Sequence, residues 1–468
     1  MHGASSSSSK RHRRVSRNSV TKHNVLGFLS YLAALLVLVL VSRAEDRSPT
    51  PENSPQEAYL RIFSPDFWYE HAVGKPQPPA KYVAVIIVGQ DMPKTIGQTS
   101  VSCAKEIPVA CKRRVYLAQL LDALSDFAPK VVVLDMWFDP EACPDVESRD
   151  LWDELGRFSA RVPVVSGLGS FNPSEILTAW PAEFADISNR QPSLMSTELV
   201  LKPRTHPTRA GKATTNEGVV ELNSDNRKIP LSWPVYDSFA TVSEPGQPRR
   251  VDSLSIVAVR AFDPKSKILK SVGALGPEDS PNASTQVHPY TSFLKEEDLP
   301  ITRAIDVICS ARGGDYSLST CNSVEKRRLD PQTMFGGKIV LIGQAGVSGD
   351  VHASVVGNVP GVILQANYIE SLLQNRIYKP LPKIWQLIIG IVWLAVVFWM
   401  SWRFISHPVQ NIFFSLIAVI IPAYFIHLFI LHFHYYTELL VQFILAAIIL
   451  NITRWIDRFV THREESLP

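Results

Sequence analysis

Several polar side chains in the sequence follow directly after apolar runs of the length of a β-strand. In an open parallel sheet, ligands bind in the crevice beyond the carboxyl ends of the strands, so these side chains are candidates for a binding site. The candidate ligand-binding residues are Asp91, Arg113, Arg114, Asp135, Phe138, Asp139, Gln344 and Asp350. The carboxylates, with the two arginines at the start of a predicted helix, could hold a cationic or hydrogen-bonding ligand. They could also only neutralise one another.

Asp135 is the candidate with the clearest physical reason for a polar partner. It ends the otherwise apolar run VVVLD, and a carboxylate that is buried in such surroundings needs a partner. We therefore expect Asp135 to contact either a ligand or another polar group at the end of its strand.

Catalytic motifs are incomplete in this sequence. The segment GVSGD has Asp350 where the nucleophile elbow of a hydrolase requires glycine. FGGK, at 335–338, precedes a strand rather than a helix, which excludes a phosphate-binding loop. The cysteines show no zinc spacing, and His427, His432 and His434 are interpreted as membrane-interface residues. We expect a protein that is not an enzyme, with no catalytic residue, metal site or cofactor.

The elements that must position the candidate residues follow from hydrophobic periodicity. Runs that are apolar on both faces suit a parallel sheet covered by helices on both sides. Residues 170–250 are rich in Pro, Asn and Thr, which predicts an irregular segment with short strands such as 218–223. The predicted strands are 81–88, 130–138, about 162–166 and 337–343; the predicted helices are 113–127, 148–159, 253–262 and 361–375; and a turn-rich loop is predicted at 344–360. The predicted fold class is α/β with a mainly parallel central sheet.

Four other segments are apolar and long enough to cross a bilayer as helices. They are residues 25–42, 384–402, 411–431 and 435–453. The positive-inside rule places the basic tail 1–24 and the short tail 454–468 in the cytoplasm, and residues 43–383 outside. The first segment could also be a cleaved signal peptide, but we favour an anchor because its apolar run exceeds the usual signal. The basic tail is interpreted as a flank of this span and not as a nucleic-acid-binding arm.

Cysteine usage agrees with export, because all five cysteines lie in the predicted outer segment. We expect Cys309 to pair with Cys321 and Cys103 to pair with Cys111, which leaves Cys143. The connectivity among the first three cysteines stays open, since spacing alone does not decide it.

Four segments taken in order carry a resemblance to a known family. They are VAVIIVGQD, RRVYLAQLLDALSDFAPKVVVLDMWFD, GKIVLIGQAGVSGD and PGVILQANYIESLLQNRIYKPLP, followed by three apolar spans. This series resembles the second-type CHASE domain, the cyclases/histidine kinases associated sensory extracellular domain. The resemblance covers roughly residues 25 to 453. It implies an outer domain that senses a ligand and signals through the membrane, with a bacterial inner membrane as the location.

The end of the chain differs from that family pattern. After Trp455 only IDRFVTHREESLP follows, which is too short to bury a core, so we expect no kinase or cyclase domain. The first hypothesis is a membrane-anchored sensor that detects a small molecule or protein outside and acts on a separate cytoplasmic effector. The second is a non-catalytic envelope scaffold whose outer domain binds another protein. A transporter is disfavoured because the spans carry no charged residue apart from Glu438, near the start of the last one. Assembly with further copies of the chain stays open.

Overall fold

The computed structural model describes residues 78–89, 109–136, 145–171, 199–201, 216–220, 222, 226–237, 249–273, 288–311, 330–345, 350–403 and 424–437. The chain divides into two compact units, each of which is described by itself. One unit is Glu52–Tyr378, and the other combines Met1–Pro51 with Lys379–Pro468.

A six-stranded sheet forms the centre of the unit Glu52–Tyr378. Its strands are β1 (Val83–Val88), β2 (Val131–Asp135), β3 (Val164–Leu168), β6 (Asn216–Val219), β10 (Ile301–Arg303) and β11 (Ile339–Gln344). The order is β10-β1-β11-β2-β3-β6, and every neighbouring pair is parallel. The predicted α/β class with a mainly parallel sheet is thus confirmed.

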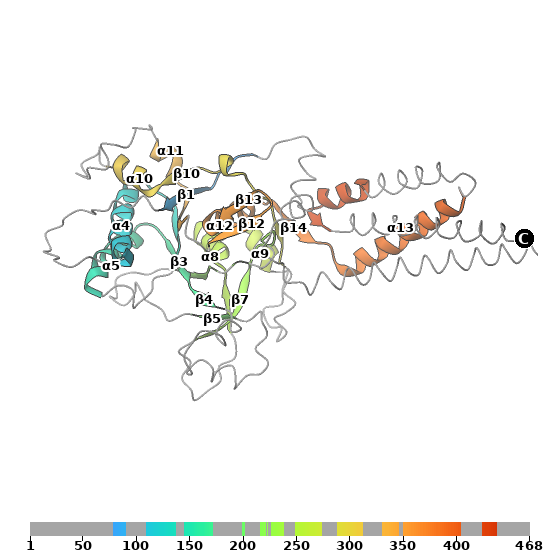
Figure 1. Ribbon diagram of the computed structural model, residues 1–468, viewed down its shortest axis with the longest axis horizontal. Coiled ribbons are helices and arrows are strands. Elements are labelled where there is room, and N and C mark those ends of the chain that lie inside the picture. Colours follow the sequence, from blue (N-terminus) through green and yellow to red (C-terminus); the bar gives the residue numbers. More distant parts are fainter. Residues whose placement is uncertain are drawn as a thin grey trace, which may run out of the picture. The chain divides into compact units, whose positions relative to one another are not determined.

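Helices cover both faces of this sheet (Figure 1). One face packs on α4 (Val109–Leu124), α5 (Asp145–Ser159) and α10 (Ala304–Ser310), and the other packs on α8 (Leu254–Phe262) and α12 (Gly361–Leu373). Successive side chains of a strand point to opposite faces: Val83 and Val85 of β1 belong to the α8/α12 core, and Ala84 and Ile86 belong to the α4/α5/α10 core. The continuous apolar runs of the sequence are therefore explained by burial on both faces.

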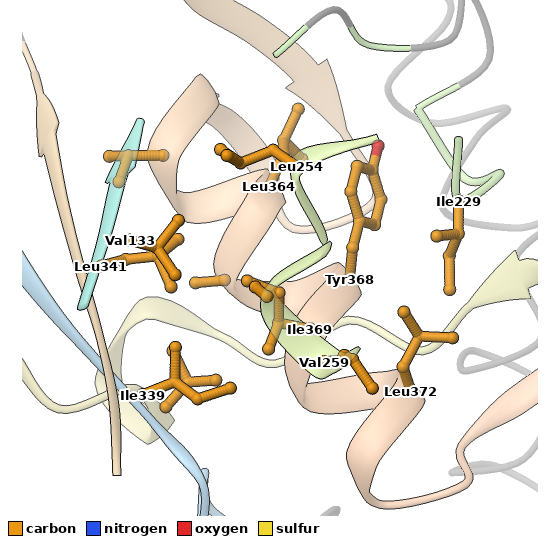
Figure 2. Packing of buried hydrophobic residues seen from close by; sticks show 14 of the residues in the cluster. Val133, Ile229, Leu254, Val259, Ile339, Leu341, Leu364, Tyr368, Ile369 and Leu372 are labelled. Atoms are coloured by element: carbon orange, nitrogen blue, oxygen red, sulfur yellow. The ribbon is translucent and has the colours of Figure 1, made fainter. Parts of the chain in front are cut away.

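Helix α12 is buried on all sides and not only on its apolar face. Figure 2 shows Leu364 and Ile369 of this helix on the side of Val133 and Leu341 of the sheet, whereas Tyr368 lies farther from these strands. Its polar side chains form hydrogen bonds with the backbone of neighbouring loops. The N–H of Leu294 donates to Asn367 Oδ1 at 2.6 Å, Ser371 Oγ donates to the carbonyl of Ser292 at 2.6 Å, and the Tyr368 hydroxyl donates to the carbonyl of Asn226 at 2.8 Å. Helix α12 therefore holds the surrounding loops in place as well as filling the core.

The segment predicted to be irregular contains a second sheet of four strands. These are β4 (Ser170–Phe171), β5 (Leu199–Leu201), β7 (Ser232–Asp237) and β8 (Arg249–Asp252), in the order β4-β5-β7-β8. The predicted loop 344–360 also contains a hairpin, β12 (Val351–Ser354) and β13 (Gly357–Pro360). The turn of this hairpin uses Gly357 at φ 107°, a conformation that glycine adopts without strain. The loop prediction was therefore wrong for residues 351–360.

Several short elements complete this unit. They are η1 (Ser125–Phe127), α9 (Lys267–Gly273), β9 (Tyr290–Thr291), η4 (Glu296–Asp298) and α11 (Pro331–Phe335). The unit ends within β14 (Ile377–Pro380), whose residues Ile377 and Tyr378 pair with Thr291 and Tyr290.

The other unit contains the end of β14, α13 (Lys383–Arg403), a helical stretch at 424–432 and β15 (Tyr435–Tyr436). Its strand residues Lys379 and Pro380 pair with β15 in parallel. Within the described part of the chain, no helix has both the length and the apolarity that a membrane crossing requires. The predicted span 384–402 lies within α13 and is not confirmed as a membrane crossing, whereas 25–42 lies outside the described residues, as do most of 411–431 and 435–453.

Gly343 of β11 is a point where the sheet and α12 approach closely. A Cβ added there would lie 2.6 Å from both Cβ and Cγ2 of Val362. We expect Gly343→Ala to lower the free energy of unfolding by about 1–3 kcal/mol, because the crowding forces α12 away from the sheet. Gly89→Ala is the matched control, since its Cβ would meet only Ile87 Cγ2 at an ordinary 3.9 Å. Thermal unfolding of the two full-length variants, compared with the native chain, measures the difference; equal stabilities would contradict the close approach.

Candidate functional site

The candidate site lies at the carboxyl edge of three neighbouring strands, β1, β11 and β2. Gln344 ends β11 beside Val88 of β1, and Gly343 pairs with Asp135, the last residue of β2. The strands end together because they are parallel and in register, which places the polar groups that follow each apolar run at the same edge.

The hairpin and the start of α12 supply the other side of the site. Asp350 stands directly before β12, and His352 lies within that strand. The Nε2 of His352 is 3.3 Å from Asp350 Oδ1, with the His352 side chain 30% and the Asp350 side chain 43% exposed. The Gly361 N–H, at the start of α12, donates to the Asp350 carbonyl at 3.2 Å.

The Asp350 carboxylate lies against Gly361. A Cβ on residue 361 would be 2.5 Å from Asp350 Oδ1. The carboxylate therefore sits beside the first turn of α12, where the positive end of the helix dipole favours an anion. The site thus combines a carboxylate at a helix start, an imidazole and the terminal residues of two strands.

Asp135 has the most perturbed acid–base equilibrium at this edge. Although its side chain keeps partial exposure, the surrounding protein removes much of its hydration, and this desolvation raises its pKa from 3.8 to about 7. The negative charge of Asp350 also raises this pKa, whereas His352 lowers it. Near neutral pH, Asp135 is therefore divided between the carboxylate and the carboxylic acid, which can donate a hydrogen bond.

The structure brings together only some of the predicted site residues. Asp135, Gln344 and Asp350 lie at the carboxyl edge described above. Arg114 does not stand at a helix start, because α4 begins at Val109; its buried guanidinium lies 5.6 Å from the ring centroid of Trp152 in α5. Asp91, Phe138, Asp139 and the Arg113 side chain lie outside the described residues.

His352 and Gly361 belong to the site but were not predicted from the sequence. The signal for His352 was its place two residues after Asp350, since alternate residues of a strand share a face. That signal required the strand β12, which was predicted as loop.

Among the described residues, no group of three or more His, Cys, Asp and Glu side chains is arranged to hold a metal ion. The chemistry available at the site is therefore that of hydrogen bonding and charge pairing: Asp135 as donor or acceptor, Asp350 as acceptor and His352 as either.

Cys309 lies in α10 and is disulfide-bonded. The side chains of Cys103, Cys111, Cys143 and Cys321 lie outside the described part of the chain. The pairing of Cys309 with Cys321, and that of Cys103 with Cys111, therefore stay predictions.

Comparison with known proteins gives one match. The model of the CHASE2 domain family matches residues 33–402, which includes the whole sheet and all the helices that cover it. No curated protein and no solved structure matches the chain. CHASE2 domains are sensory extracellular domains, and the matched range covers most of the sequence. The chain therefore belongs to the CHASE2 domain family.

Proposed function

We propose that this chain is a membrane-anchored signal-input protein. Its extracytoplasmic CHASE2 domain detects a ligand at the carboxyl edge of β1, β11 and β2 and passes the signal through the membrane to a separate effector protein. The family match supports the sensory role. The observation that carries the location is Asp135, a carboxyl group at the end of a buried strand whose pKa is raised to about 7 by burial, with Asp350 and His352 close enough to influence it.

The chemistry of this edge suits a small polar ligand. Asp350 and His352 are partly exposed and already paired with each other, so a ligand can exchange for that pairing without opening the core. Asp135 offers a proton donor or acceptor according to its protonation. A ligand with both a donor and an acceptor would satisfy these three groups together. In this proposal the domain is a receptor and not an enzyme.

Helix α12 connects the site with the end of the domain. It begins at Gly361, against the Asp350 carboxylate, and ends at Leu373, four residues before β14. A helix of this length spans about 20 Å as a rigid element. A ligand that moves Asp350 would therefore shift the first turn of α12, and the shift would reach the strand that leads out of the unit.

The membrane part of the proposal uses the segments 25–42, 384–402, 411–431 and 435–453 as spans, with residues 43–383 outside and both termini in the cytoplasm. It is supported by the sequence pattern and by the apolar surface of α13, where Ile384, Trp385, Val392 and Trp399 are exposed. Reporter fusions test this layout. Alkaline phosphatase fused after residue 210 should be active in a bacterial host, and the same enzyme fused after residue 406 should be inactive; the opposite pattern would overturn it.

Ligand detection is tested with the full chain in detergent. The probe is a panel of amino acids, polyamines and sugars, and the readout is the thermal unfolding temperature. A compound that stabilises the native chain should lose its effect in Asp135→Asn and in His352→Ala, whereas the exposed Asp126→Asn should respond like the native chain. A stabilising compound that acts equally on all variants would move the binding site away from this edge.

The output is tested by purification of the full chain from its native membrane, followed by mass spectrometry of the proteins that accompany it. Recovery of a cytoplasmic kinase or cyclase supports the split receptor. Recovery only of extracytoplasmic proteins contradicts it and favours the envelope scaffold.

A further inference from the structure

The amino edge of the central sheet carries a row of basic residues that the ligand site does not use. Four neighbouring strands have one base each, one to three residues before their first residue. In the order of the sheet these are Lys81 before β1, Lys338 before β11, Lys130 before β2 and Arg161 before β3. Lys81, Lys130 and Arg161 are exposed, and Lys338 is partly exposed. We call these four residues the basic edge.

Backbone hydrogen bonds show that the residues of this row are neighbours. The N–H of Lys130 donates to the carbonyl of Lys338 at 2.8 Å, and the N–H of Ile339 donates to the carbonyl of Tyr82 at 2.8 Å. Because the strands are parallel, all four bases project at the end opposite to Asp135. The domain thus has a titratable carboxyl edge and a cationic amino edge.

Aromatic side chains accompany two of the lysines. The Nζ of Lys130 lies 4.0 Å from the ring centroid of Phe262, and the Nζ of Lys81 lies 5.1 Å from that of Tyr82. The Tyr82 and Phe262 rings are 5.9 Å apart in an edge-to-face arrangement. Lysines beside partly buried aromatic rings combine an apolar body with a cationic tip, which is the composition that favours a membrane–water interface.

Further charges lie next to this row. The exposed lysines Lys265, Lys267 and Lys270 follow Phe262 closely in the chain. The acids on the neighbouring segments are Asp263 after α8, Glu296, Glu297 and Asp298 in η4, Asp126 in η1 and Asp330 before α11. Of these, Glu297 is paired with Lys295 at 3.7 Å. Counted with Lys295, eight bases at and next to this edge stand against these six acids, so the balance of charge is slightly positive.

The chain also leaves the unit from this edge. Near the end of α12, Gln374 Nε2 donates to the carbonyl of Pro79 at 3.4 Å, and Glu370 of the same helix accepts the N–H of Lys81 at 2.8 Å. Four residues after Gln374 the chain reaches Tyr378, the last residue of the unit, and the proposed span begins at Ile384. The amino edge is therefore the edge from which the chain continues to the membrane segment.

We propose that the basic edge docks on anionic lipid headgroups at the outer surface of the membrane. The inference rests on the proposed function, because it requires residues 384–402 to enter a bilayer. Each lysine or arginine near an anionic surface contributes attraction that decays within the Debye length. Docking would fix the orientation of the domain and leave the carboxyl edge, with Asp135, open to the surrounding solution.

The test uses the full chain in lipid nanodiscs, either of phosphatidylcholine alone or of an equimolar mixture with phosphatidylglycerol. An amine-reactive ester labels exposed lysines, and mass spectrometry follows the rate at each site. We expect Lys81 and Lys130 to be labelled about five-fold more slowly in the anionic discs, the factor that corresponds to about 1 kcal/mol of attraction for each residue. Added salt should abolish the difference through screening.

Two variants and one added anion test whether the slower labelling comes from the basic edge and from lipid. Arg161→Gln combined with Lys130→Gln should return the labelling rate of Lys81 towards its value in neutral discs. Arg303→Gln is the control, because Arg303 is 54% exposed but ends β10 at the opposite edge, and it should leave that rate unchanged. Inorganic phosphate added to neutral discs should not slow labelling; slowing equal to that in anionic discs would identify a phosphate site and overturn lipid docking.

Failure of the docking and failure of the membrane anchor give different results in this experiment. A chain that enters the discs but is labelled at the same rate in both compositions overturns the docking and leaves the membrane anchor intact. A chain that does not enter the discs at all overturns the membrane part of the proposed function, and it overturns the docking as well.

Discussion

Replacing Glu370 by alanine is expected to lower the free energy of unfolding by about 3–5 kcal/mol. Glu370 is completely buried in α12, and its carboxylate accepts three consecutive backbone N–H groups at the start of β1: Lys81 at 2.8 Å, Tyr82 at 3.0 Å and Val83 at 2.9 Å. Alanine would leave these donors without acceptors, and that of Val83 is shielded from water. Urea unfolding of the full chain in detergent measures the loss.

A second substitution separates the hydrogen bonds from the packing. Glu370→Gln keeps the volume and one acceptor oxygen but turns an N–H₂ group towards backbone donors, so we expect a loss between those of the native chain and the alanine variant. Glu297→Ala, which removes a carboxylate that is 75% exposed, should change the free energy by less than about 0.5 kcal/mol. A loss below about 1 kcal/mol in Glu370→Ala would show that water replaces the carboxylate.

Asp135→Asn is expected to stabilise the protein at pH 8 by up to about 4 kcal/mol, and not to stabilise it near pH 4. The pKa of Asp135 is raised from 3.8 in the unfolded chain to about 7 in the folded domain, because burial disfavours the charged form. Below pH 3.8 both states are protonated, so no penalty exists. As the pH rises to about 7, the unfolded state ionises first, and folding progressively loses stability until both states are charged. Asparagine carries no charge, so the variant does not lose stability as the pH rises through this range.

The measurement is the unfolding temperature of the native and variant chains between pH 4 and pH 8. Asp126→Asn is the control, since Asp126 is exposed in η1, and its profile should run parallel to that of the native chain. A stability difference between Asp135→Asn and the native chain that does not change with pH would place the charge penalty elsewhere. Asp350→Asn should lower the pKa of Asp135, because one of the charges that raise it is removed.

Much of the central sheet could be predicted from the sequence because its strands are apolar on both faces. VAVIIV and IVLIGQ leave no other element type that is as short and as apolar, and β1 and β11 fall within two residues of the predicted starts. Asp135 could be singled out as a candidate site residue for a related reason: a charge that ends such a run must face a polar environment or shift its pKa.

Other features could not be predicted because they depend on partners distant in the chain. The pattern of α12 predicted one apolar face, but Asn367, Glu370 and Ser371 are also buried, since loops and a strand start supply their partners. Only the folded structure shows that a carboxylate of α12 meets three N–H groups of β1. Arg114 was misplaced for a local reason: the segment VACK was not recognised as the first turn of α4, although Pro108 before it is a typical helix-start residue.

The position of β11 has a consequence for the biogenesis of the domain. This strand is the last of the central sheet to be synthesised, yet it lies between β1 and β2, where Ile342 pairs with Ile86 on one side and Leu134 on the other. Until residue 344 has been exported, β1 and β2 have no shared neighbour and expose unpaired edges that invite aggregation. Folding must therefore wait until almost the whole domain has been synthesised, and its long-range pairing makes folding slow. A chain of this design depends on protection during export more than a domain whose strands pair in the order of synthesis.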